Sequence, residues 1–112
     1  MHDRRVGWEM DQLTEIQKLV LEQVRDIAIH LLRGTSAKVY LFGSWARGEN
    51  RMSSDIDIAV EHDGDVSLEL MLQLKEELEE STVAYRVDVV DLTYAEIPLV
   101  EAVRREGILW ND

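Results

Sequence analysis

The apolar residues of this 112-residue chain switch repeatedly between helical and strand-like spacing. Apolar residues three or four positions apart are typical of an amphipathic helix, whereas alternation at every second residue is typical of a half-buried strand. Successive segments follow the order helix, strand, helix, strand, helix, strand, helix. This order predicts an α/β (α+β) domain in which a small mixed β-sheet of three to four strands is flanked by helices.

The strand pattern appears at residues 38–42, 55–60 and 83–92, each of which is rich in β-branched residues or alternates apolar with polar ones. A turn follows the first of these segments, and Ser44 is expected to cap a short helix there that ends at Arg47.

The first long helix is predicted at residues 14–33, with Thr14 and Gln17 as a capping box and Gly34 as the stop. A second is predicted at residues 66–80. Its buried face is expected to consist of Leu68, Met71, Leu74 and Leu78.

The terminal helix is expected to follow a second capping-box pair, Thr93 and Glu96. Pro98 fits only the first turn of such a helix, and Gly107 is expected to end it.

Length and composition favour a single globular domain that spans residues 1–112, with residues 1–12 as a loose N-terminal segment. The content of 46% hydrophobic and 31% charged residues excludes wholesale disorder. The absence of cysteine excludes disulfides, thiolate metal sites and cysteine nucleophiles. No apolar stretch is long enough for a membrane span or a signal-peptide core, so we expect a cytoplasmic protein with no membrane partner.

The net charge of −11 repels the phosphate backbone of nucleic acids, so we expect no direct nucleic-acid binding. The charge is also uneven. Residues 1–60 hold 9 acidic and 8 basic residues, whereas residues 61–112 hold 14 acidic and 4 basic ones. A protein partner that docks on the second half is therefore expected to be basic.

Residues 41–58 contain the pattern most informative about chemistry. Gly43 allows close backbone approach, and Ser44 at a helix start adds a hydroxyl and free N–H groups, which together suit a triphosphate. Asp55 and Asp57 alternate on one strand, which puts two carboxylates on one face about 7 Å apart along the backbone. Asp88 could add a third carboxylate, to make a site for one or two Mg²⁺ ions.

Three sequence segments together resemble the DNA polymerase β nucleotidyltransferase superfamily, in particular its minimal nucleotidyltransferase (MNT) branch. They are Phe-Gly-Ser-x-Ala-Arg-Gly at 42–48, Ser-Asp-Ile-Asp-Ile at 54–58 and Val-Asp-Val-Val-Asp-Leu at 87–92. The resemblance implies the nucleotidyltransferase fold and a set of site residues. The nucleotide would be bound by Gly43, Ser44, Arg47 and Ser54. The catalytic and metal-binding carboxylates would be Asp55, Asp57 and Asp88, with two Mg²⁺ ions.

The resemblance further implies transfer of AMP from ATP to a hydroxyl acceptor. The leading hypothesis is an antitoxin that forms a hetero-oligomer with a HEPN-family ribonuclease toxin, or another basic subunit, and adenylylates a toxin tyrosine. Two alternatives remain open: a catalytic subunit that modifies a small molecule, and a non-catalytic antitoxin that acts by binding alone. Trp45 and Asn50 depart from residues common in the branch.

A few other residues allow two interpretations. Arg25 and His30 match the loose Arg-x4-His pattern of HEPN ribonucleases, which a long helix easily produces by chance. His62 is expected to be an exposed loop residue and Asp91 a strand-end or turn residue. The three tryptophans, Trp8, Trp45 and Trp110, favour core or interface positions, with Trp45 as the best candidate for stacking on a base.

Overall fold

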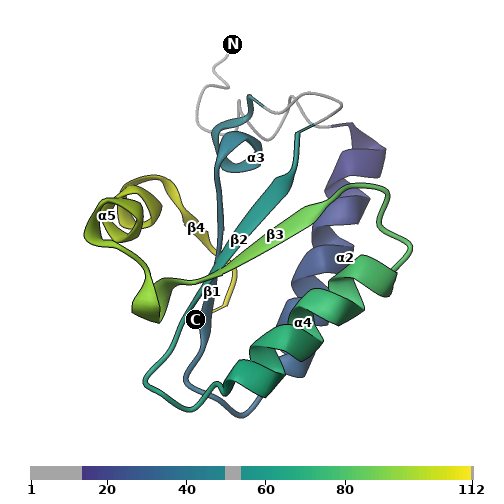
Figure 1. The fold of residues 1–112 in the computed structure, drawn as a ribbon. Helices are drawn as coiled ribbons and strands as arrows, with labels where there is room; N and C mark the ends of the chain where they lie inside the picture. Colours follow the sequence, from purple (N-terminus) through teal and green to yellow (C-terminus); the bar gives the residue numbers. More distant parts are fainter. Residues whose placement is uncertain (1–13, 50–53, 112) are drawn as a thin grey trace.

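The computed structural model describes residues 14–49 and 54–111. The predicted loose segment at residues 1–12, which includes Trp8, and the departure at Asn50 lie outside the described residues. Within the described part, a mixed four-stranded sheet is flanked by helices (Figure 1). The predicted fold class is therefore confirmed.

The sheet has the strand order β3-β2-β1-β4. β1 (Lys38–Phe42) pairs antiparallel with both β2 (Ile56–Glu61) and β4 (Ile108–Leu109), whereas β2 pairs in parallel with β3 (Val87–Asp91). The sequence pattern did not predict β4, because two residues are too few to show a strand period. β3 and β4 are the edge strands.

Helices cover both faces of the sheet. α2 (Glu15–Leu31) and α4 (Leu68–Glu80) lie side by side on one face, and α5 (Ile97–Glu106) lies on the other (Figure 1). Two apolar clusters fill the spaces between these layers. The larger one joins α2 and α4 to the sheet and includes Val24, Leu74, Ile56 and Ile58; the smaller one is built on Ala59, Leu92 and Val103.

The start of α2 is as predicted. Thr14 Oγ1 accepts a hydrogen bond from Gln17 N, and Gln17 Oε1 accepts one from Thr14 N, both at 3.0 Å. The helix ends at Leu31, and Gly34 with φ of 86° lies in the turn that follows. A reciprocal capping box satisfies two backbone donors that a helix start leaves unpaired.

Two of the predicted capping and burial details are wrong. α4 begins at Leu68 with Ser67 as its N-cap, and the side chain of Leu68 is 75% exposed rather than buried. Thr93 does not cap the last helix, because it lies in a separate 3₁₀ turn (η1, Leu92–Tyr94). The N-cap of α5 is Glu96, which makes no side-chain capping bond. Ser67 Oγ accepts from Leu70 N at 3.0 Å and so sets the start of α4, and the 3₁₀ turn removes Thr93 from the start of α5.

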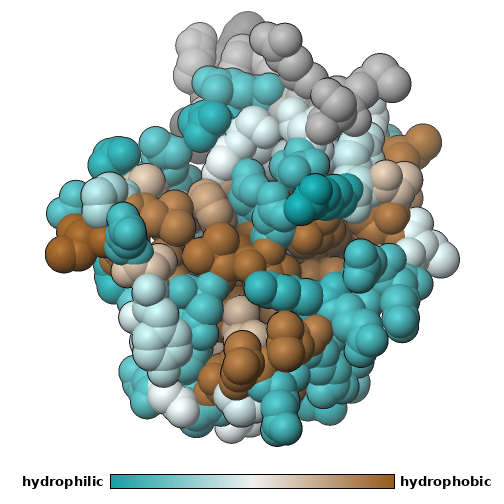
Figure 2. Space-filling model, in the orientation of Figure 1, coloured by the Kyte–Doolittle hydropathy of each residue, from teal (hydrophilic) through white to brown (hydrophobic). Residues whose placement is uncertain are grey.

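Pro98 in the first turn of α5 and Gly107 at its end are confirmed. No helix among the described residues is long and apolar enough to cross a membrane. The outward surface over α4 is mixed in Figure 2: it carries the five glutamates of the helix and also the exposed side chains of Leu68 and Leu72.

The burial of α4 gives a direct test of its orientation. We expect Leu74→Ala to lower the free energy of unfolding by about 2–5 kcal/mol, because Leu74 is fully buried and its truncation leaves a cavity. Urea unfolding followed by circular dichroism measures the loss. Leu72→Ala is the matched control: this leucine is 53% exposed, and its truncation is expected to cost less than about 1 kcal/mol. Equal losses in the two variants would contradict the packing of α4.

Candidate functional site

Gly43 is the position in the site with the least space for a side chain. It joins β1 to the short helix α3 (Ser44–Arg47) with φ of 78° and ψ of −158°, a backbone region that is essentially restricted to glycine. A Cβ at this position would overlap Asp57 Oδ2 and lie 3.2 Å from Asp57 Cγ. Glycine is therefore needed for two reasons, the backbone angles and the space that the carboxyl group of Asp57 occupies.

The predicted role of Ser44 as a helix cap is wrong. Ser44 is the first residue of α3, and the N-cap is Gly43, which has no side chain to make a capping bond. The hydroxyl of Ser44 therefore belongs to the first turn, beside the backbone N–H groups that begin the helix. α3 ends at Gly48, which adopts the left-handed conformation with φ of 74°.

The three predicted aspartates lie at the same end of the sheet, next to α3. Asp57 on β2 lies in register with Asp88 on the parallel strand β3, and Asp55 lies just before β2. Burial raises the pKa of Asp57, and the negative charges of Asp88 and Asp55 raise it further. The positive charge of the Arg47 guanidinium acts in the opposite sense and lowers this pKa.

Both arginines near the carboxylates already have acidic partners. Arg47 is exposed, and it pairs through Nε with Glu49 at 3.0 Å and through Nη1 with Glu106 of α5 at 3.2 Å. These two carboxylates raise the pKa of Arg47. Arg86 pairs through Nε with Asp88 Oδ1 at 3.3 Å. Glu106 and Arg86 were not among the predicted site residues, since neither belongs to a recognisable local pattern.

Trp45 lies beneath this site rather than on its surface. Its side chain is only 1% exposed, its ring meets that of Tyr85 edge-to-face at 4.9 Å, and its Nε1 donates to the backbone oxygen of Ser54 at 3.3 Å. The core position favoured for the tryptophans is confirmed for Trp45, and its candidacy for stacking on a base is wrong. The indole ties Ser54, just before Asp55, to the Gly-Ser turn.

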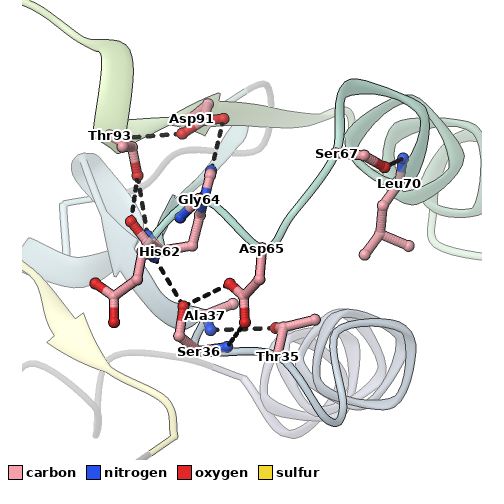
Figure 3. Close-up of polar contacts among 11 residues, drawn as sticks. Thr35, Ser36, Ala37, His62, Gly64, Asp65, Ser67, Leu70, Asp91 and Thr93 are labelled. Atoms are coloured by element: carbon pink, nitrogen blue, oxygen red, sulfur yellow. Dashed lines mark hydrogen bonds and ion pairs between the residues drawn. The ribbon is translucent and has the colours of Figure 1, made fainter.

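His62 belongs to a structural cluster of polar contacts (Figure 3). The cluster lies at the opposite end of β2, about 17 Å along the strand from Asp57. Its side chain is fully buried, which corrects the expected exposed loop position. His62 Nδ1 accepts from Gly64 N at 2.9 Å, so Nε2 carries the proton and donates to Asp91 Oδ2 at 3.1 Å. Asp91 is the last residue of β3, as predicted, and it also accepts from Thr93 N.

Arg25 and His30 both lie on α2, where Arg25 Nε donates to the backbone oxygen of Trp110 at 3.3 Å. This contact joins α2 to the segment after β4 and gives Arg25 a structural role.

The carboxylate oxygens of Asp55, Asp57 and Asp88 are chemically suitable ligands for a hard divalent cation. Carboxylate oxygens are the ligands that Mg²⁺ prefers, and clustered negative charges are relieved by a shared cation. In residues 14–49 and 54–111, no three acidic or histidine side chains converge closely enough to form a preassembled metal site. The Asp88 carboxylate is instead paired with Arg86.

The contact between Gly43 and Asp57 can be tested without an activity assay. We expect Gly43→Ala to lower the free energy of unfolding by about 1–3 kcal/mol and to shift the NMR signal of the Asp57 carboxyl carbon, because the new methyl group displaces that carboxylate. Gly34→Ala is the matched control: Gly34 also has positive φ, but a methyl group there would meet no described residue within 4 Å beyond its chain neighbours. An Asp57 signal that stays unchanged in Gly43→Ala would contradict the contact.

The sequence matches the family described as "Polymerase beta, Nucleotidyltransferase" over residues 22–110. It is 44% identical over 78 residues to a Methanocaldococcus jannaschii protein named "Putative protein adenylyltransferase", with 69% of this chain and 81% of the relative covered.

Solved structures agree with this assignment. One described as "putative minimal nucleotidyltransferase" has a TM-score of 0.66 and 35% identity, with 80% of this chain and 92% of that chain covered. A chain in a crystal structure of a toxin–antitoxin with AMP-PNP has a TM-score of 0.64 and 32% identity, with 78% and 72% covered. A chain in a complex of tri-AMPylated Shewanella oneidensis HEPN toxin with MNT antitoxin has a TM-score of 0.63 and 26% identity, with 84% and 71% covered.

The family match spans most of the chain and includes the Gly-Ser turn and all three aspartates. The chain therefore belongs to the polymerase β nucleotidyltransferase family and is a nucleotidyltransferase of the minimal type.

Proposed function

We propose that this protein is a Mg²⁺-dependent adenylyltransferase that moves AMP from ATP to a tyrosine hydroxyl of a HEPN-class partner. The observation that carries the proposal is the position of Asp57. Its carboxylate lies against Gly43, at the end of the Gly-Ser turn, and is close enough to Asp55 and Asp88 for their charges to raise its pKa. Such a group of like charges beside a turn with open N–H groups suits a cation that is bound together with a triphosphate.

The residues divide into two sets by chemistry. The triphosphate would be bound by Gly43, Ser44, Arg47 and Ser54. The cations would be bound by Asp55, Asp57 and Asp88. When bound, Mg²⁺ would neutralise the triphosphate and lower the pKa of the acceptor hydroxyl.

The transfer itself depends mainly on alignment. The acceptor oxygen forms a bond to the α-phosphorus, the bond to the bridging oxygen breaks, and pyrophosphate leaves. Asp88 can serve as a metal ligand or accept the proton of the hydroxyl. Arg47 would exchange its contacts with Glu49 and Glu106 for phosphate oxygens, because an arginine fork matches either kind of anion.

Two observations favour a protein acceptor. The relatives include a named protein adenylyltransferase and a complex that contains an AMPylated HEPN toxin. In addition, the excess negative charge of residues 61–112 is suited to docking on a basic protein. ATP and such a partner would both be available in the cytoplasm, which we propose as the site of action.

The same carboxylates argue against an antitoxin that acts by contact alone. A half-buried aspartate with a raised pKa destabilises the fold at neutral pH, because burial and its neighbours oppose the charged form. A protein that only binds its partner has no need of this arrangement, whereas a metal-dependent transferase does.

Intact-mass spectrometry of a co-expressed HEPN-class partner tests the proposal. We expect mass gains in AMP-sized steps with the wild-type chain and none with the Asp55→Asn, Asp57→Asn double variant. A stable complex without any mass gain, in wild type as well as in the variant, would overturn protein adenylylation. ATP turnover with small hydroxyl compounds would then test the small-molecule alternative.

Asp57→Asn alone is expected to have two opposite effects. It should reduce AMP transfer at least a hundredfold, in line with the loss of a metal ligand, and yet raise the melting temperature at neutral pH. The gain arises because the raised pKa of Asp57 makes its ionised form unfavourable in the folded state.

The difference in stability between Asp57→Asn and the wild type is expected to depend on pH. Above the raised pKa, wild-type Asp57 is charged and the variant is the more stable protein. As the pH falls through this pKa toward the ordinary value of 3.8, wild-type Asp57 becomes neutral and the difference disappears. Thermal unfolding from neutral to acidic pH measures it. A variant less stable than wild type at neutral pH would contradict the electrostatic account.

A further inference from the structure

A cavity of about 640 Å³ lies next to the carboxylates, between α4 and the free edge of β3. Both elements lie on the same side of the molecule and contact each other (Figure 1). The polar side chains that line the cavity are Lys75, Glu79, Tyr85, Arg86 and Asp88. Asp88 is thus shared between the cavity and the group of carboxylates.

The position of this cavity relative to the Gly-Ser turn suggests what it holds, on the basis of the function proposed above. Along the end of the sheet, the order is α3 after β1, then Asp57 on β2, then Asp88 on β3, and then the cavity. In-line transfer requires the acceptor oxygen and the leaving pyrophosphate to lie on opposite sides of the α-phosphorus. If the triphosphate extends toward Gly43, an acceptor that approaches from the opposite side, past Asp88, lies in this cavity.

The basic side chains at the cavity indicate which charged group the acceptor carries. Residues 61–112 contain only four basic residues, and two of them, Lys75 and Arg86, line the cavity. Lys75 is the one basic residue of α4, whose other charged residues are all glutamates. The guanidinium of Arg86 lies 3.3 Å from the Asp88 carboxylate, so an anion adjacent to the acceptor hydroxyl would come close to it.

We propose that this cavity is the acceptor site and that Lys75 and Arg86 select an acceptor with an anionic group beside its hydroxyl. Two sources can supply that anion: an acidic side chain next to the acceptor tyrosine, or the phosphate of an AMP unit already attached to the partner. Both present oxygen anions that ammonium and guanidinium groups recognise.

The test uses the full chain with Lys75→Gln and Arg86→Gln combined, a HEPN-class partner as acceptor, and AMP-PNP as the nucleotide probe. We expect the KM to rise about tenfold or more for the partner form that carries the anion, either the unmodified partner or the partner with one AMP attached, because two charge-assisted contacts are lost. The affinity for AMP-PNP, measured by calorimetry with Mg²⁺, should change less than about twofold.

The matched control is Lys38→Gln combined with Arg104→Gln. These two basic residues line a separate cavity of about 530 Å³ near His62, so the control removes the same charge away from the carboxylates. It is expected to leave the KM for the partner near the wild-type value.

Intact mass distinguishes the two sources of the anion. If the Lys75/Arg86 variant adds the first AMP at the normal rate and then stops, the anion is the phosphate of the attached AMP. If the first addition is already slow, the anion is an acidic side chain beside the acceptor tyrosine. Equal KM values in the variant, the control and the wild type, both for the unmodified partner and for the partner that already carries one AMP, would overturn this inference and leave the proposed function intact. A parallel loss of AMP-PNP affinity would also overturn it, because the cavity would then belong to the nucleotide. Absence of transfer by the wild-type chain would overturn the proposed function and this inference together.

Discussion

The contact between the Asp57 carboxylate and the backbone of Gly43 is the constraint on which the rest of the site depends. It requires that residue 43 have no side chain, that the turn after β1 adopt positive φ, and that β1 and β2 pair with Phe42 opposite Asp57. Each condition is met by a different part of the structure. Together they hold a half-buried carboxylate beside a helix start, where its charge is unfavourable in the absence of a cation.

The two ends of the sheet have different roles: one carries the candidate site, and the other stabilises the strand pairing. At the α3 end, the parallel pairing of β2 with β3 brings Asp57 and Asp88 side by side, and like charges are concentrated there. At the other end, buried His62 is satisfied by Asp91 and Gly64, and Thr93 exchanges hydrogen bonds with the His62 backbone (Figure 3). The first arrangement is electrostatically strained and suits ligand binding. The second is fully hydrogen-bonded and holds the ends of β2 and β3 together, which stabilises the register that the first needs.

Several predictions from local sequence patterns were wrong. Leu68 has the spacing of a buried residue, yet α4 starts there and the side chain extends past the end of the core. Thr93 and Glu96 have capping-box spacing, yet the chain first makes a 3₁₀ turn that aims Thr93 at His62. Trp45 lies within the candidate nucleotide-binding motif, yet its ring packs against Tyr85. For Thr93 and Trp45, contacts with His62 and Tyr85, which are distant in sequence, outweigh the local pattern.

The sequence by itself determined the layered α/β architecture and the identity of the candidate site residues. Helical and strand periods predict the element types, and the chemistry of a Gly-Ser turn with three aspartates is readable from residue type and spacing. Only the tertiary structure decided that Asp88 lies in register with Asp57. It also decided that Arg86 pairs with Asp88 and Arg47 with Glu106. The cavity beside Asp88, with Lys75 and Arg86 in its lining, likewise follows from the packing of α4 near β3. These features arise from pairing and packing between segments far apart in the chain, where local periodicity carries no information about register or side-chain contact.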